Sequence, residues 1–344
     1  MKSRCKLLAC LASKSWGWRK HSLRRVFTAT QRSIMDYSAA AYHPYLSGTQ
    51  MEKLEVTQRK CIRLITGQYS NTNKDALYLE SSIPTYSTHS KRLIATAYEK
   101  GMRQPDNHPR RTAIDKTVTH RAKLRSSLRV KGQEYTASLP TSDSARRPLP
   151  SKIFEPWTSG ERNWKVTPNQ DVKRDIPAVL NVIESLQADV VIYTDGSCAE
   201  GLHDGGAAAV VTTGTASVPV QVDVRQAKGD KHTCSYQEEE RALLLGLDWV
   251  EEHPQQKTAI CTDSLSLLQA MDSLNPTTSE VRSRIESLPG SFDLLYVPGH
   301  KDVPGNELAD QFAKEAAGFA GPYARGDVSM EAACSAIKAP SRMM

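Results

Sequence analysis

The sequence predicts an α/β fold from about residue 188 onward, a five-stranded mixed sheet flanked by helices, with a helical basic region before it. After Asp189, β-rich runs and helical patterns follow one another in the order β-β-β-α-β-α-α-β-α. Before residue 104 the apolar spacing is helical. The net charge changes sign near residue 190. These three observations divide the chain into two parts of different character.

The elements of the C-terminal fold are expected from their local patterns. Val220, Val222 and Val224 alternate with polar residues, as in a strand with one face covered. The predicted strands cover 190–194, 206–213, 218–227, 258–262 and 292–297. The predicted helices cover 237–252, 264–273, 279–288 and 305–317.

The N-terminal part is expected to be helical and then loosely ordered. Helical spacing runs through 22–42, 51–67 and 88–102, and Gly67 is a plausible helix stop. Eight prolines and several Arg/Lys clusters between 105 and 187 predict a basic linker, with a helix at 177–187. The predicted domains are therefore a helical region at 1–104, a linker at 105–187, an α/β domain at 188–320 and a flexible tail at 321–344.

The charge is distributed unevenly. Residues 1–190 hold 33 Lys and Arg against 16 Asp and Glu, a net charge of +17. Residues 191–344 hold 12 against 22, a net charge of −10. A basic half suits a polyanion, and an acidic half suits metal cations. Two solvated surfaces of unlike charge are the alternative.

Cysteine usage and hydropathy set limits on the class of protein. The seven cysteines contain no Cys-x-x-Cys pair, which argues against a disulfide framework and a zinc site. The apolar run at 7–12 is too short for a signal-peptide core, and no stretch approaches the length that spans a bilayer. We expect an intracellular protein of the nucleus or cytoplasm, monomeric and without membrane contact.

Four carboxylates stand at ends of predicted strands or in first turns of predicted helices. Asp195 and Asp263 end strands, and Glu239 and Asp310 lie near helix beginnings. Such positions can converge at one edge of a sheet, where like charges repel unless a divalent cation compensates them. Oxygen ligands suit Mg²⁺ or Mn²⁺ rather than zinc. Two such ions about 4 Å apart can serve phosphodiester cleavage.

Four motifs in this order resemble the ribonuclease H family. They are Tyr193-Thr-Asp-Gly-Ser197, Ser235-Tyr-Gln-Glu-Glu-Glu-Arg-Ala-Leu243, Cys261-Thr-Asp-Ser264 and Gly299-His…Gly305-Asn-Glu-Leu-Ala-Asp310. The resemblance implies a ribonuclease H-like fold. It also implies a metal-dependent endonuclease that hydrolyses the RNA strand of RNA–DNA hybrids with two Mg²⁺ ions, which Mn²⁺ can replace.

The same resemblance implies a role for each acid. Asp195 bridges both ions, and Asp310 helps hold the ion that activates the attacking water. Glu239 and Asp263 help hold the ion at the leaving oxygen, and His300 assists proton movement or product departure. As alternatives, Asp263 is only a helix cap, Asp310 only a solvated acid and His300 only a loop residue.

Residues next to these acids are candidates for binding substrate or for fixing a helix end. The family spacing Glu-x-x-Ala-Leu selects Glu239 from three adjacent glutamates, a choice that helical pattern alone cannot make. Gly196, Ser197 and Ser235 are candidates for reading the 2′-hydroxyl that distinguishes RNA from DNA. Asn306 and Glu307 are expected to fix the entry to the last helix rather than to touch substrate.

The first hundred residues resemble a different segment. Tyr42-His-Pro-Tyr-Leu46, Met51-Glu-Lys-Leu54, Gln58-Arg-Lys-Cys-Ile-Arg-Leu-Ile-Thr-Gly67 and Leu79-Glu-Ser-Ser-Ile-Pro84 are similar to the post-polymerase segment of non-LTR retrotransposon Pol proteins. In those proteins this segment links reverse transcriptase to ribonuclease H. No Tyr-x-Asp-Asp polymerase motif occurs in the chain. The resemblance implies a fragment of a Pol protein, and a generic basic helical domain is the alternative.

Two other functions stay open at the level of sequence. One is a catalytically silent nucleic-acid-binding remnant, against which the four intact acids speak. The other is a DNA-directed nuclease of the same superfamily, against which the Thr-Asp-Gly-Ser and Gly-Asn-Glu-x-Ala-Asp strings speak. Few basic residues lie between Asp263 and Asp310, so the N-terminal part is expected to supply the phosphate contacts to the hybrid.

Overall fold

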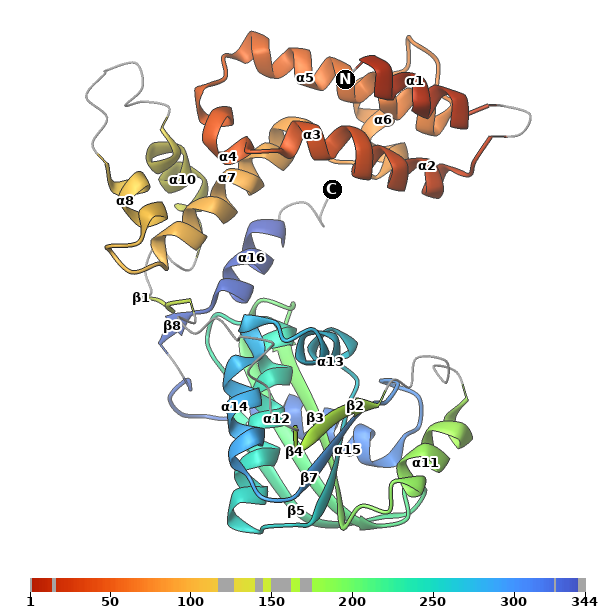
Figure 1. Ribbon diagram of the computed structural model, residues 1–344, viewed down its shortest axis with the longest axis vertical. Helices are drawn as coiled ribbons and strands as arrows, with labels where there is room; N and C mark the ends of the chain where they lie inside the picture. The colour runs from red at the N-terminus through yellow and green to blue at the C-terminus, as the bar shows by residue number, and fades with distance from the viewer. Residues whose placement is uncertain are drawn as a thin grey trace. The chain divides into compact units, whose positions relative to one another are not determined.

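The computed structural model describes residues 2–13, 17–116, 127–139, 145–149, 162–167, 175–324 and 326–339. The chain divides into two compact units (Figure 1). Unit 1 comprises Met1–Asp143 with Ala336–Met344, and unit 2 comprises Ser144–Ser335. In the described part of the chain no helix has the length and apolar character that crossing a membrane requires.

A six-stranded mixed sheet forms the centre of unit 2. Its strands are β2 (Trp164–Thr167), β3 (Val190–Ala199), β4 (His203–Gly214), β5 (Pro219–Lys228), β6 (Lys257–Thr262) and β7 (Ser291–Tyr296). They lie in the order β2-β7-β6-β3-β4-β5. The strands β3, β4 and β5 pair antiparallel, and the pairs β3–β6, β6–β7 and β2–β7 are parallel. The α/β class is confirmed, with one strand more than predicted.

Helices cover both faces of this sheet. They are α11 (Ile176–Ser185), α12 (Ser235–Glu252), α13 (Leu265–Asp272), the 3-10 turn η6 (Pro276–Thr278), α14 (Ser279–Ser287) and α15 (Pro304–Ala317). Side chains alternate along a strand, so neighbours in β3 enter different cores. Ile192 packs with Leu243 and Leu247 of α12, whereas Tyr193 packs with Ala309 of α15 and Val179 of α11. Both cores are continuous and buried.

Unit 1 is helical. Its elements are α1 (Lys2–Leu11), α2 (Lys20–Phe27), the π-helix η1 (Thr28–Arg32), α3 (Ser33–Asp36), α4 (Ala39–Tyr42), the 3-10 turn η2 (His43–Tyr45), α5 (Gly48–Thr66), α6 (Lys74–Ser81), α7 (Tyr86–Met102), α8 (Pro109–Asp115) and α10 (Leu128–Thr136). A capping box of Ser47 and Gln50 begins α5, and Gly67 ends it with a left-handed φ of 70°. The helix predicted over 22–42 is interrupted at Ser38, whose φ is 53°.

The predicted linker and tail contain more structure than expected. The range 105–187 holds α8, α10, the strand β1 (Ala145–Arg146), β2 and α11, and 321–344 holds the strand β8 (Asp327–Val328) and α16 (Met330–Lys338). The strands β1 and β8 pair parallel. Parts of both predicted segments, 117–126, 140–144, 150–161, 168–174, 325 and 340–344, lie outside the described residues. Short strands such as these depend on their partners and carry little signal of their own.

Candidate active site

The register of the central strands brings two acids together. In the parallel pair β3–β6, Thr194 stands opposite Thr262, the last residue of β6. Asp195 and Asp263 therefore follow the last paired residues on adjacent strands. The prediction that Asp195 ends its strand is wrong, because β3 continues to Ala199 by pairing with β4. Asp195 instead lies where β3 extends beyond the end of its parallel neighbour.

The start of α12 brings the third acid to the same place. A Cβ atom at Gly196 would lie 2.3 Å from the backbone carbon of Glu238 and the backbone nitrogen of Glu239, so only glycine permits this approach of helix and strand. Thr262 Oγ1 donates a hydrogen bond of 3.3 Å to Glu239 Oε2. Carboxylate oxygens of Asp195, Glu239 and Asp263 lie within 4.8 Å of one another.

Burial makes this cluster of acids electrostatically costly without a cation. Asp195 is 6% exposed, and burial together with the charges of Asp263 and Asp310 raises its pKa to about 7. Burial raises the pKa of Glu239 well above its ordinary value, and Asp195 and Asp263 add to this shift. Burial also raises the pKa of Asp263. A hard divalent cation with oxygen ligands is the partner that such a donor set fits.

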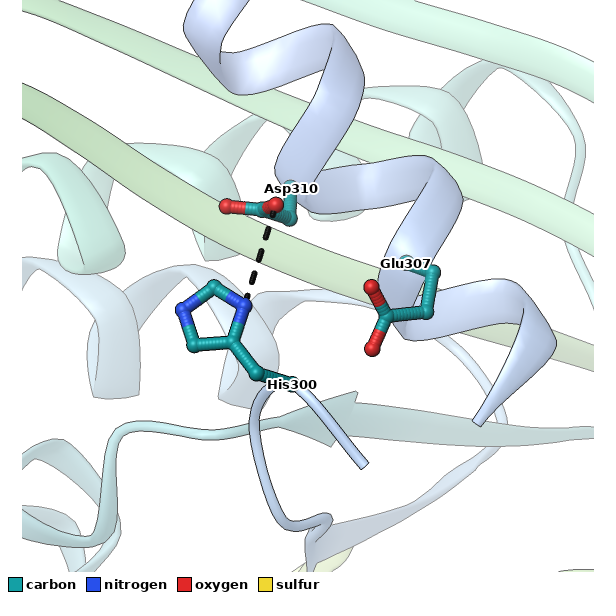
Figure 2. Close-up of side chains that lie close together, drawn as sticks. All are labelled: His300, Glu307 and Asp310. Carbon is teal, nitrogen blue, oxygen red and sulfur yellow. Dashed lines mark ion pairs between the residues drawn. The ribbon is translucent and has the colours of Figure 1, made fainter. Parts of the chain in front are cut away.

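A second group of ligand atoms lies on α15 and the loop before it. Figure 2 shows His300 facing Asp310, with Glu307 one helical turn away. His300 Nδ1 lies 4.0 Å from Asp310 Oδ2, and Lys314 Nζ lies 2.5 Å from the same oxygen. Ligand atoms of His300, Glu307 and Asp310 lie within 4.8 Å of one another. The charge of Asp310 raises the pKa of both Asp195 and Asp263, so all four predicted acids interact.

Glu307 lies in the first turn of α15, where it was expected to fix the helix entry. Its carboxylate also lies with His300 and Asp310, a proximity that was not predicted. The spacing of three residues between Glu307 and Asp310 was the available signal, because residues i and i+3 share one helix face. Asn306, expected in the same role, is buried at the beginning of α15.

The loop that carries His300 is held against Asp263. A Cβ atom at Gly299 would lie 2.2 Å from Asp263 Oδ2, so the loop approaches the carboxylate more closely than any other residue allows. His300 has a left-handed φ of 52°, and its side chain is 73% exposed. The imidazole is thus open to solvent and next to two of the acids.

The alternative that Asp263 serves only as a helix cap does not fit the local geometry. Ser264 is the residue at the N-cap position of α13. The Ser264 backbone N–H donates to Thr262 Oγ1 at 3.1 Å. The Asp263 carboxylate faces Glu239 and Gly299 instead.

The three substrate-binding candidates lie near Asp195 and Glu239. Gly196 and Ser197 follow Asp195 in β3, where Gly196 has the packing role described above. Ser235 is exposed at the first position of α12, and its Oγ lies 3.4 Å from Cys198 Sγ.

One protein-family model matches the part of the chain that contains these acids. Residues 187–318 match the family model described as RNase H. No curated protein sequence matches the chain. The N-terminal RNase H domain of rv2228c from Mycobacterium tuberculosis is a similar solved structure, with 22% identity, a TM-score of 0.33, and coverage of 38% of this chain and 94% of that chain.

Two further solved structures are similar to the same extent. RNase H1 from Halobacterium salinarum has 20% identity and a TM-score of 0.32, with coverage of 37% of this chain and 96% of that chain. LC11-RNase H1, crystallised with an RNA/DNA hybrid, has 17% identity and a TM-score of 0.32, with coverage of 38% and 96%. The family match and the sheet identify residues 187–318 as an enzyme domain of the ribonuclease H family.

Proposed function

We propose that this chain is a metal-dependent endonuclease that hydrolyses the RNA strand of RNA–DNA hybrids. The observation that carries the proposal is the buried cluster of Asp195, Glu239 and Asp263 beside Asp310. Acids on β3, after β6 and on two helices repel one another, and a bound cation offsets that repulsion. Two Mg²⁺ or Mn²⁺ ions supply an activated water and stabilise the departing oxygen of the phosphodiester when bound.

Each side chain has a distinct task in this proposal. Asp195 would hold both ions, since its carboxylate interacts electrostatically with both Asp263 and Asp310. Glu239 and Asp263 would help hold the ion that stabilises the leaving oxygen, and Asp310 would help hold the ion that activates the attacking water. His300 accepts or passes a proton, or helps the product leave, from its exposed position beside Asp310.

We propose that residues next to Asp195 and Glu239 distinguish RNA from DNA. The 2′-hydroxyl is the group that separates RNA from DNA. Backbone groups at Gly196 and the hydroxyls of Ser197 and Ser235 are proposed to bind it. Their support is their position beside Asp195 and Glu239.

We also propose that unit 1 is the post-polymerase segment of a retrotransposon Pol protein. Residues of three of the motifs behind this resemblance make buried contacts, and two of these motifs contact each other. His43 Nε2 lies 3.0 Å from the Tyr86 hydroxyl, and Gln58 Nε2 donates to the Pro84 carbonyl at 2.9 Å. His43 and Gln58 are buried. A polymerase reading frame directly upstream in the coding DNA would support this origin, and an unrelated intact gene there would contradict it.

The nuclease proposal is tested with the purified full chain on a hybrid labelled in either strand. RNA-strand cleavage in Mg²⁺ or Mn²⁺ is expected, with 5′-phosphate products, and Asp263→Asn is expected to abolish it. Absence of cleavage in both metals would favour the silent binding remnant. Preferential cleavage of duplex DNA would favour a DNA-directed nuclease.

A further inference from the structure

A second buried polar network lies beneath the first turn of α12, apart from the four acids. At its centre is Asp230, between β5 and α12 and 1% exposed. Arg147 Nη2 and Arg241 Nη2 each lie 3.0 Å from its carboxylate, and Gln237 Nε2 donates to it as well. A buried carboxylate that is hydrogen-bonded to several charged and polar donors is held in one position.

Two segments outside residues 187–318 complete this network. Arg147, which follows β1, donates from its backbone N–H to the Val328 carbonyl of the β8 strand at 3.0 Å. The Arg147 guanidinium also donates to Asp327 Oδ1, from Nη2 at 3.0 Å and from Nε at 3.1 Å. Arg147 thus joins the paired strands β1 and β8 to Asp230 through one rigid planar group.

Gln237 connects this network to the helix that carries Glu239. Its Nε2 donates to Asp230, and its Oε1 accepts a hydrogen bond of 2.6 Å from Ser329 Oγ. Ser329 directly follows β8 and is 2% exposed. Both polar atoms of the Gln237 amide are therefore hydrogen-bonded, Nε2 to Asp230 and Oε1 to Ser329.

The neighbouring residue Glu238 adds a second anchor. It is fully buried, and its carboxylate accepts hydrogen bonds from Thr233 Oγ1 at 2.5 Å and the Asp230 backbone N–H at 3.4 Å. The N-cap residue Cys234 makes no side-chain cap hydrogen bond. The first turn of α12 is thus fixed by these side-chain contacts rather than by a helix cap.

We propose that Arg147 and Ser329 are positioning residues for Glu239, and that the β1–β8 pair belongs to the functional nuclease unit. Glu239 lies two residues after Gln237 and one after Glu238, so a loosened first turn displaces its carboxylate from Asp195 and Asp263. This inference rests on the proposed function, because it assigns Glu239 to the metal. Outer partners that orient a ligand typically contribute about tenfold to a hundredfold in metal affinity.

The inference is tested in the full chain with Arg147→Ala and Ser329→Ala. Arg225→Ala is the matched control, because Arg225 pairs with Glu252 at the opposite end of α12. Mn²⁺ affinity is measured by calorimetry without substrate, and deuterium exchange is measured at the amides of 237–239. Both network variants are expected to bind Mn²⁺ about tenfold more weakly and to exchange faster at these amides. Arg225→Ala is expected to change neither.

A conservative variant separates positioning from charge. Arg147→Lys keeps the positive charge but not the planar group that reaches Asp230 and Asp327 together, so it is expected to restore little of the affinity. Wild-type Mn²⁺ affinity in folded Arg147→Ala and Ser329→Ala, even with a lowered Tm, would overturn the inference. If the wild-type chain bound no Mn²⁺, the proposed function would fail, and unchanged exchange at 237–239 in both variants would overturn the positioning role independently.

Discussion

At the scale of single residues, the three consecutive glutamates show how environment assigns function. Glu239 meets Asp195 and Asp263, whereas Glu238 is buried against Thr233 and Asp230. Glu240 is half-buried on a third side of the helix. Periodicity could not choose among them, because apolar residues follow on several faces of α12. Family spacing selected Glu239, and the geometry supports that choice.

The same substitution at Glu239 and at Glu240 compares a proposed metal ligand with its neighbour in the sequence. Glu239→Gln is expected to lower kcat for hybrid cleavage by at least about a hundredfold, since it removes a metal ligand. Glu240→Gln has the same chemistry one position later and is expected to retain wild-type kcat. Steady-state kinetics on a labelled hybrid measures both. Equal losses in the two variants would contradict the assignment.

A substitution at Gly299 tests how closely the loop that carries His300 must approach the Asp263 carboxylate. Gly299→Ala places a methyl group 2.2 Å from Asp263 Oδ2, so either the loop or the carboxylate must move. A displacement of this kind is expected to lower kcat about a hundredfold. Gly48→Ala at the start of α5, where a Cβ meets nothing within 4 Å, is the control. Full activity in Gly299→Ala would show that this approach is dispensable.

The raised pKa of Asp195 predicts how stability changes with pH. The pKa is about 7 in the folded metal-free chain and 3.8 for an unperturbed side chain. The folded state therefore binds the proton more tightly, and stability present at acid pH is lost as pH rises through this window. Thermal unfolding without metal should show Tm falling between about pH 4 and pH 7, and Mg²⁺ should restore it at pH 7.5.

The same argument applies to a neutral substitution. Asp195→Asn removes the buried charge, so the metal-free chain at pH 7.5 is expected to gain about 2 kcal/mol in the free energy of unfolding. The variant should also lose the stabilisation by Mg²⁺. Denaturant unfolding with and without metal measures both. A variant less stable than wild type without metal would contradict the electrostatic account.

At the scale of elements, the sequence predicted those helices and strands that are determined by local hydrophobic patterns. The strands and helices from 190 to 317 lie close to their predicted positions, because alternating and helical patterns are strong there. The remaining features of the sheets depend on pairing with other strands. The strand β3 extends past Asp195 because β4 pairs with it, and β2 joins the sheet through β7. The pair β1–β8 joins Ala145 to Asp327, and no local window of sequence detects a pairing over that separation.

The site was predictable to a similar degree. The four acids and His300 were predicted from strand ends, helix beginnings and motif order, and the structure brings these side chains close together. The proximity of Glu307 to His300 and Asp310 was not predicted, because the Asn306-Glu307 pair indicated only a helix entry. Lys314, which pairs with Asp310, was also missed, since an i, i+4 pair on an exposed helix face is common.

At the scale of the whole molecule, the uneven charge predicts a division of labour. Residues 1–190 carry a net charge of +17, although Arg32 and Arg103 are buried in unit 1, with hydrogen bonds to Gln58 and Glu99. Deleting residues 1–143 leaves unit 2 with Arg147 intact. The deletion is expected to raise the Kd for hybrid and to flatten its salt dependence, since phosphate contacts release counterions. Binding titrations at several salt concentrations measure this, and unchanged Kd and slope would refute it.

The central claim is that acids distant in the sequence hold divalent ions together. Anomalous diffraction from crystals of the chain grown with Mn²⁺ and an uncleavable hybrid locates those ions directly. We expect anomalous peaks between the carboxylates of Asp195, Glu239, Asp263 and Asp310, and none there in Asp195→Asn. Saturating Mn²⁺ with no peak among these carboxylates, or with peaks only elsewhere, would contradict the account.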